Sequence, residues 1–105
     1  MRVLFMVLLA GLLSVPPVAA EVVEVEIRKM RFTPAEIVIK PGDTVVWKNA
    51  ERRQYHNVWF QQFDAEEPDY LFPGDSYQRT FEQEGEFAYI CGPHPKMKAV
   101  VIVED

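Results

Sequence analysis

The sequence predicts an all-β protein, a Greek-key antiparallel β-sandwich of about seven to eight short strands. Two observations carry this prediction. From residue 21 onward apolar and polar residues alternate with a period of two, and turn residues interrupt the alternation at short intervals. The chain of 105 residues has room for one small domain, and no repeat, low-complexity tract or linker divides it.

The first twenty residues stand apart from this pattern. Arg2 provides a positive start, residues 3–13 are almost uninterruptedly apolar, and residues 18–20 are small, as at a signal-peptide cleavage site. The apolar run is shorter than the ~20 residues that a membrane-spanning helix needs. We therefore predict a cleaved signal peptide over residues 1–20 and an exported, periplasmic domain over residues 21–105, without stable membrane insertion. A retained membrane anchor is the alternative.

The first half of the domain contains four predicted strands. Residues 22–29 (VVEVEIRK) alternate strictly, and residues 35–40 (AEIVIK) stop at a Pro-Gly turn. Residues 43–49 (DTVVWKN) and 56–60 (HNVWF) are rich in β-branched and aromatic side chains, which favour strands.

The second half begins with an irregular stretch and ends with three strands. Residues 61–75 (QQFDAEEPDYLFPGD) have room for one helical turn, but two prolines exclude a long helix. Residues 76–81 and 86–91 flank a Glu-Gly turn, and residues 98–104 close the chain. Period two places Cys91 on the same face as Phe87 and Tyr89, which points it into the sandwich.

The charge of the domain excludes several classes of partner. The full chain carries a formal charge of −5, and loss of Arg2 with the signal peptide changes it to −6, from 10 Lys and Arg against 16 Asp and Glu. An acidic exported protein is a poor candidate for binding nucleic acid or anionic membranes.

A single seven-residue stretch, residues 91–97 (CGPHPKM), concentrates side chains that bind metals. It holds the one cysteine of the chain and one of its two histidines. In an oxidising compartment a cysteine without an intramolecular partner is buried, bridged to another chain, or bound to a metal. Two prolines flank His94 and stiffen the loop, which suits the placement of ligands.

The second histidine, His56, opens a predicted strand that can lie beside the strand ending at Cys91. His56, Cys91, His94 and Met97 would then supply two imidazoles, a thiolate and a thioether, the ligand set of a blue copper electron-transfer centre. Zinc is the competing metal, although structural zinc sites have little use for methionine. The alternative without a metal is a buried structural thiol with a core methionine.

These residues resemble those of the cupredoxins, closest to the amicyanin and plastocyanin branch. The resemblance runs from about residue 23 to residue 104, and the Cys-x2-His-x2-Met spacing is that of amicyanins. It implies one type 1 copper ion bound by His56, Cys91, His94 and Met97. It also implies that the backbone of Asn57 donates a hydrogen bond to the ligand sulfur, while the side chain of Asn57 ties the two ligand loops together.

Three positions depart from the pattern of that branch. Gly92 stands where Thr or Ser is common, which predicts a weaker side-chain tie from Asn57. Tyr55 replaces a frequent proline, and Lys98-Ala99 stands where relatives often have a glycine. None of the three removes a predicted ligand.

The resemblance implies a monomeric one-electron carrier and not an enzyme. His94 would be the electron port, within an apolar patch of Met30, Tyr55, Pro93 and Pro95. The implied partners are redox proteins, with a dehydrogenase as donor and a c-type cytochrome or an oxidase as acceptor. The resemblance further implies that His94 leaves Cu(I) and protonates at mildly acid pH.

Other functions and other docking surfaces remain open at this stage. A copper-delivery or storage protein would use the same four ligands, whereas a multicopper enzyme would need more histidines than the chain has. Two charged groups are candidate docking surfaces. One is acidic (Asp64, Glu66, Glu67 and Asp69) and the other is basic (Arg52, Arg53, Lys96 and Lys98). A solvated loop without a docking role accounts equally well for the acidic group.

Overall fold

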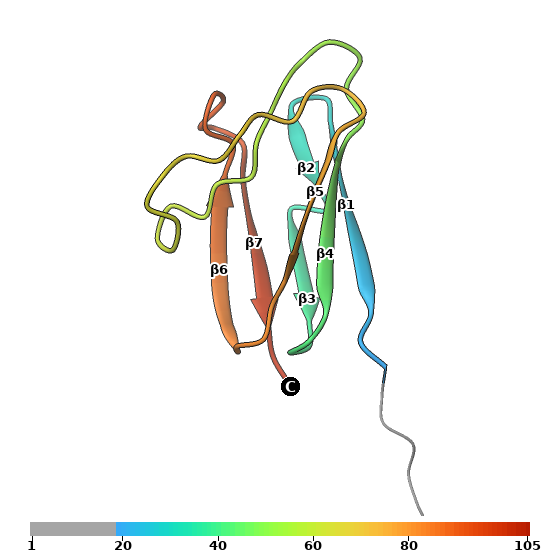
Figure 1. The fold of residues 1–105 in the computed structure, drawn as a ribbon, viewed down its shortest axis with the longest axis vertical. Coiled ribbons are helices and arrows are strands. Elements are labelled where there is room, and N and C mark those ends of the chain that lie inside the picture. Colours follow the sequence, from blue (N-terminus) through green and yellow to red (C-terminus); the bar gives the residue numbers. More distant parts are fainter. Residues whose placement is uncertain (1–18) are drawn as a thin grey trace, which may run out of the picture.

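The computed structural model describes residues 19–105 and consists of two facing β-sheets (Figure 1). The predicted signal peptide lies outside the described residues, except for Ala19 and Ala20. None of the described residues forms a helix long and apolar enough to cross a membrane.

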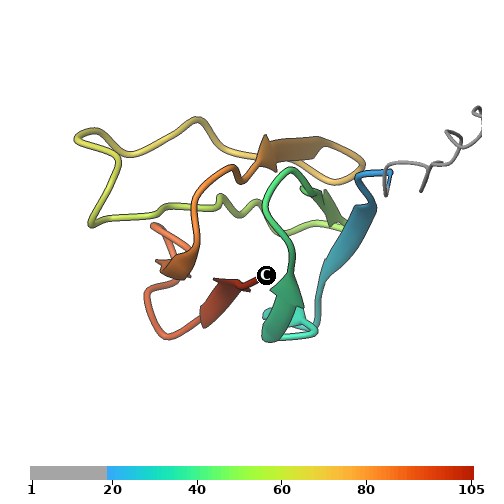
Figure 2. The same ribbon diagram turned by 90° about the horizontal axis from the view of Figure 1, so that it is seen from below.

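Seven strands are divided between the two sheets, and the chain crosses from one sheet to the other three times. The first sheet has the order β2-β1-β4-β5 and the second the order β3-β7-β6. The strands are β1 (Val22–Arg28), β2 (Arg31–Thr33), β3 (Glu36–Ile39), β4 (Thr44–Asn49), β5 (Ser76–Thr80), β6 (Gly85–Ile90) and β7 (Lys98–Val103). The predicted sandwich is therefore confirmed, and seen from below the strands of the two sheets surround a common interior (Figure 2).

The pairing within the sheets is not purely antiparallel, which corrects one part of the prediction. β1 pairs in parallel with β4, and β3 pairs in parallel with β7. The remaining pairs, β1 with β2, β4 with β5, and β6 with β7, are antiparallel. In each parallel pair the two strands are not consecutive in the chain. β2 and β3 lie between β1 and β4 in the sequence, and β4, β5 and β6 lie between β3 and β7.

Two strand assignments differ from the sequence prediction. Residues 56–60 do not form a strand but make two isolated antiparallel bridges, His56 with Leu71 and Trp59 with Ile90. The segment is held between two different neighbours, so no continuous ladder forms along it. The short strand β2 was not predicted, because three residues are too few to show alternation.

The core lies between the two sheets and is rich in aromatic side chains. Trp47 on β4 donates a hydrogen bond from Nε1 to the hydroxyl of Tyr89 on β6 at 3.0 Å, and both residues are buried. The rings also meet edge to face, with centroids 5.4 Å apart. Burial raises the pKa of Tyr89 to about 12, so the hydroxyl stays neutral and joins the two sheets.

Candidate metal centre

The candidate ligands meet at the end of the sandwich where β6 passes into β7. Figure 1 shows the loop between these two strands at that end. Residues 91–97 form the loop between these strands, and its backbone closes on itself. The Cys91 N–H donates to the Met97 carbonyl at 3.0 Å, and the Met97 N–H donates to the His94 carbonyl at 2.9 Å. These bonds make a compact turn that carries three of the four predicted ligands.

His56 lies at the same end of the sandwich but belongs to a different segment, residues 56–60. The bridge between Trp59 and Ile90 holds its segment against the end of β6, with backbone bonds of 2.9 and 3.0 Å in the two directions. The expected neighbourhood of residue 56 and residue 91 is therefore confirmed, although it depends on one bridge and not on a strand.

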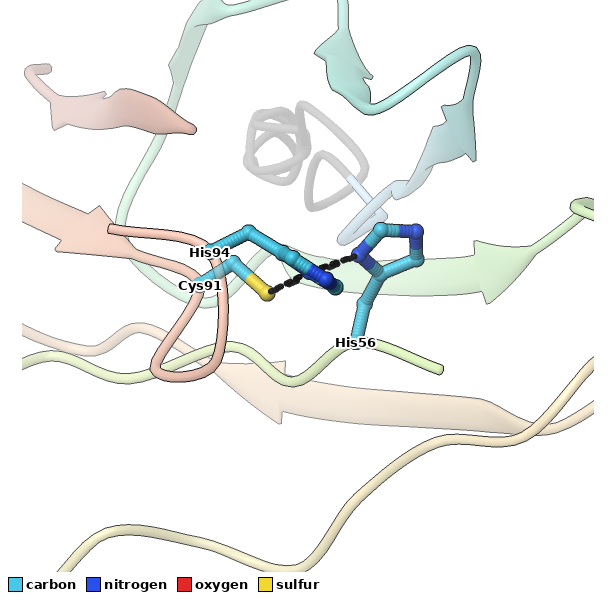
Figure 3. Close-up of side chains that lie close together, drawn as sticks. All are labelled: His56, Cys91 and His94. Atoms are coloured by element: carbon cyan, nitrogen blue, oxygen red, sulfur yellow. Dashed lines mark hydrogen bonds between the residues drawn. The ribbon is translucent and has the colours of Figure 1, made fainter. Parts of the chain in front are cut away.

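Three ligand atoms converge in the structure (Figure 3). The Cys91 Sγ lies 3.5 Å from the Nδ1 atoms of both His56 and His94, and the two Nδ1 atoms are 3.2 Å apart. The point in their plane equidistant from all three atoms is about 2.0 Å from each, close to the bond lengths of a divalent metal to imidazole nitrogen and to thiolate. The donor set and its spacing thus fit a metal ion.

Met97 is buried and lies on the same loop, beside His94. It lines a shallow apolar depression together with Met30, His94, Pro95 and Lys96. A thioether at this point matches the weak additional ligand of blue copper sites and has little affinity for zinc.

Burial favours the neutral forms of Cys91 and His56 in the absence of a metal. It raises the pKa of the Cys91 thiol, and the carboxylate of Glu67 acts in the same direction, against hydrogen bonds from the backbone of Asn57 and His94. Burial also lowers the pKa of His56, with Glu51 opposing the shift. Metal binding must therefore displace a proton from Cys91, while His56 already has an unprotonated nitrogen to offer.

Glu51 sets the orientation of His56. Its Oε2 lies 3.0 Å from His56 Nε2 and also accepts the Met30 N–H at 2.8 Å. With the Nε2 proton directed at this carboxylate, the lone pair of Nδ1 faces Cys91 and His94. Sequence reasoning missed Glu51, because nothing in the spacing of residues 51 and 56 reveals where the intervening loop turns.

Asn57 ties the two ligand loops together, as the resemblance implies. Its Oδ1 accepts the Gly92 N–H at 2.6 Å, and its Nδ2 donates to Glu67 Oε2 at 2.8 Å and to the Pro68 carbonyl at 3.2 Å. Only this orientation of the amide satisfies all three partners. The side chain is fully buried and fully bonded, so the tie is not weakened as the glycine at position 92 had suggested.

An exposed aromatic group lies on one side of the partly exposed His94. The ring of Tyr55 stacks on that of Tyr70, with centroids 4.6 Å apart, and lies 6.1 Å from the ring of His94. Phe72 is 6.0 Å from Tyr55 on the same surface. Tyr55 and Met30 were expected near His94, whereas Tyr70 and Phe72 come from the irregular stretch and were not.

The predicted acidic surface is partly used inside the protein. Asp64 forms an ion pair with Arg79, with contacts of 3.1 and 3.3 Å, and Glu67 is bonded to Asn57. The four basic residues Arg52, Arg53, Lys96 and Lys98 are exposed.

Fold and site together define a small copper protein, a β-sandwich with its ligands at one end. The chain belongs to the family of copper binding proteins described as plastocyanin/azurin, which it matches over residues 19–104. The expected resemblance to cupredoxins is confirmed, and copper is the metal of this family. The chain is a small blue copper protein of the electron-transfer class.

Several relatives are similar over most of the domain. Amicyanin of Paracoccus versutus is 40% identical over 91 residues, which cover 83% of this chain and 68% of the relative. Amicyanin-alpha of Methylorubrum extorquens is 41% identical over 85 residues, covering 77% and 71%. Chloroplastic plastocyanin of Tetradesmus obliquus is 40% identical over 73 residues, covering 60% and 50%.

Solved structures agree with this assignment. The crystal structure of amicyanin from Paracoccus versutus has a TM-score of 0.70 and 34% identity, with 85% of each chain covered. The Cu(I) form of an amicyanin variant has a TM-score of 0.73 and 35% identity, with 83% of this chain and 86% of the other covered.

Proposed function

We propose that this protein shuttles single electrons between two redox proteins in the periplasm, with His56, Cys91, His94 and Met97 as its copper ligands. The observation that carries the proposal is the convergence of one sulfur and two nitrogen atoms at 3.2–3.5 Å. Copper bound there supplies a one-electron couple, because thiolate and thioether suit Cu(I) while imidazoles suit Cu(II).

The residues around the site suit an electron carrier. The loop and the buried ties from Glu51 and Asn57 hold the ligands in one arrangement, which keeps rearrangement between the two oxidation states small. His94 is the ligand nearest the surface, and the aromatic rings beside it provide a small apolar face. Such a face suits brief encounters, since electron-transfer complexes bury little area.

The same proposal includes three further points: the protein is exported, it exchanges electrons with redox proteins, and it makes or breaks no covalent bonds in a substrate. A signal peptide over residues 1–20 would deliver the domain to the periplasm. The family resemblance predicts a dehydrogenase as electron donor and a c-type cytochrome or an oxidase as acceptor. It also predicts protonation of His94 in the reduced protein.

Absorption and EPR spectra of residues 21–105 loaded with Cu(II) test the ligand set. We expect an intense blue band that dithionite bleaches and ferricyanide restores, absent in Cys91→Ser. A colourless protein that binds only zinc would contradict the proposal.

A delivery or storage protein would use the same ligands and would give the same colour. The two functions are separated by mixing the loaded protein with a copper-binding acceptor. A carrier retains copper through repeated redox cycles, whereas a delivery protein loses it to the acceptor.

A further inference from the structure

The carboxylate of Glu67 reaches from the irregular stretch, residues 61–75, to the junction of the two ligand loops. Its Oε2 accepts a hydrogen bond from Asn57 Nδ2 at 2.8 Å. The Oδ1 atom of the same Asn57 side chain accepts a hydrogen bond from the N–H of Gly92, the residue after Cys91. Glu67, Asn57 and Gly92 thus form a chain of contacts that ends beside the sulfur ligand.

The position of Glu67 requires a glycine at residue 92. A Cβ built on Gly92 would overlap Glu67 Oε2 and would lie 2.6 Å from Glu67 Cδ. It would also lie 3.1 Å from Asn57 Nδ2, which could yield by a few tenths of an ångström. The carboxylate therefore occupies the space that any other side chain at residue 92 would take.

The charge of Glu67 lies next to the residue that follows the ligand sulfur. Its carboxylate fills the space beside the Gly92 backbone and is bonded to the Asn57 amide that also accepts the Gly92 N–H. None of the other acidic side chains in the described chain shares this contact with Asn57. Glu66 and Glu67 are both exposed residues, but only Glu67 makes this bond.

We propose that Glu67 is a positioning residue of the copper site, which holds the Asn57 amide in place and lowers the reduction potential of the bound metal through its charge. This inference rests on the proposed function. The sign follows from electrostatics, because a fixed negative charge stabilises the more positive Cu(II) state over Cu(I). Glu67 is an exposed residue, so added salt should reduce the charge effect.

Measuring the reduction potentials of four proteins tests whether the charge at residue 67 has a larger effect than a charge elsewhere on the same loop. The proteins are the wild type, Glu67→Gln, Glu67→Ala and the control Glu66→Gln, which removes one charge from the same loop. We expect the potential to rise in both Glu67 variants and to rise clearly less in the control. Equal shifts in Glu67→Gln and Glu66→Gln would overturn the charge effect.

Exchange of the Asn57 side-chain amide protons tests the positioning role in the copper-free protein. By ¹⁵N NMR we expect slow exchange in the wild type and in Glu67→Gln, where the glutamine oxygen can still accept. In Glu67→Ala we expect exchange about tenfold faster, as the loss of a hydrogen bond to a charged group implies. Unchanged exchange in Glu67→Ala would overturn this role.

Gly92→Ala tests the position of Glu67 without changing residue 67 itself. The added methyl group should displace the flexible Glu67 side chain, raise the potential and speed amide exchange, although the charge at residue 67 is retained. A potential unchanged from the wild type would contradict the proposal. A wild-type protein that forms no reversible blue centre would instead overturn the proposed function, while amide exchange would still decide the positioning role.

Discussion

His56 illustrates how a buried side chain is prepared for metal binding. It has no exposed surface, and burial disfavours its charged form. One ring nitrogen is occupied by Glu51 and the other faces the sulfur of Cys91. The ring is therefore fixed in both orientation and protonation before any metal arrives, which reduces the entropy lost on binding.

Replacing Glu51 should weaken copper binding without unfolding the protein. We expect Glu51→Ala to lower the affinity about 10- to 100-fold, because the partner that orients His56 is lost. Competition with a chelator of known affinity measures the change. Glu82→Ala, at an exposed position on the chain, is the control and should leave the affinity unchanged. Equal affinity in both variants would contradict the orienting role of Glu51.

At the scale of elements, the two sheets are joined by side chains as well as by apolar contact. Trp47 and Tyr89 come from different sheets and satisfy each other's polar atoms in the core. A buried N–H without an acceptor is costly, so this pair favours one relative placement of β4 and β6. Since β6 ends at Cys91, the placement also sets the position of the ligand loop.

Tyr89→Phe should destabilise the copper-free protein by about 1–3 kcal/mol, because the Trp47 N–H loses its acceptor in the core. Urea unfolding measures the free energy. Tyr70→Phe removes a hydroxyl from an exposed ring and should change stability by less than about 0.5 kcal/mol. Similar losses in the two variants would show that the buried hydrogen bond contributes little.

The turn between β3 and β4 contributes a pH-dependent stability. Hydrogen bonds from the backbone of Glu21 and Lys40 lower the pKa of Asp43, whose side chain accepts both at 2.8 and 3.0 Å. A carboxyl group with a lowered folded pKa stabilises the protein above its unfolded pKa, and the contribution is lost as pH falls through the folded value.

Asp43→Asn should therefore be less stable than the wild type at neutral pH, and the difference should shrink below about pH 4. Unfolding of both copper-free proteins across pH 3–7 measures the difference. A gap of constant size over the whole range would mean that ionisation of Asp43 does not contribute.

At the scale of the whole molecule, three exposed aromatic rings gather at one end. The aromatic rings of Tyr55, Tyr70 and Phe72 lie at the ligand end, beside His94. The domain as a whole is acidic, so two copies repel each other except where an apolar face permits close approach. Electron exchange between two copies should accordingly use this face.

A charge placed in the aromatic face should slow electron self-exchange. We expect Tyr55→Asp to reduce the rate about tenfold or more, because a carboxylate must lose water at the contact. Val38→Asp adds the same charge on β3, at another exposed apolar position, and should change the rate less than about threefold. NMR line broadening in mixtures of the oxidised and reduced proteins measures both rates. If both variants slowed self-exchange equally, the two copies would not meet through the aromatic face.

The sequence by itself determined the sandwich and the three ligands that share one loop. Alternation reports which side of a strand is buried, and it correctly placed Tyr89 and Cys91 inside. The loop ligands lie within seven residues, so their proximity follows from chain connectivity. His56 could be added because the chain has just one other histidine.

Only the tertiary structure decided the parallel pairing, the bridged path of residues 56–60 and the roles of Glu51 and Glu67. The sequence groups Glu67 with an acidic docking surface or a solvated loop, yet its carboxylate lies against Gly92 and Asn57. Local patterns register burial and periodicity, but they do not register which distant side chain fills a space left by a glycine. That outcome depends on the course of a long loop, which is determined by packing and hydrogen bonds across the whole molecule.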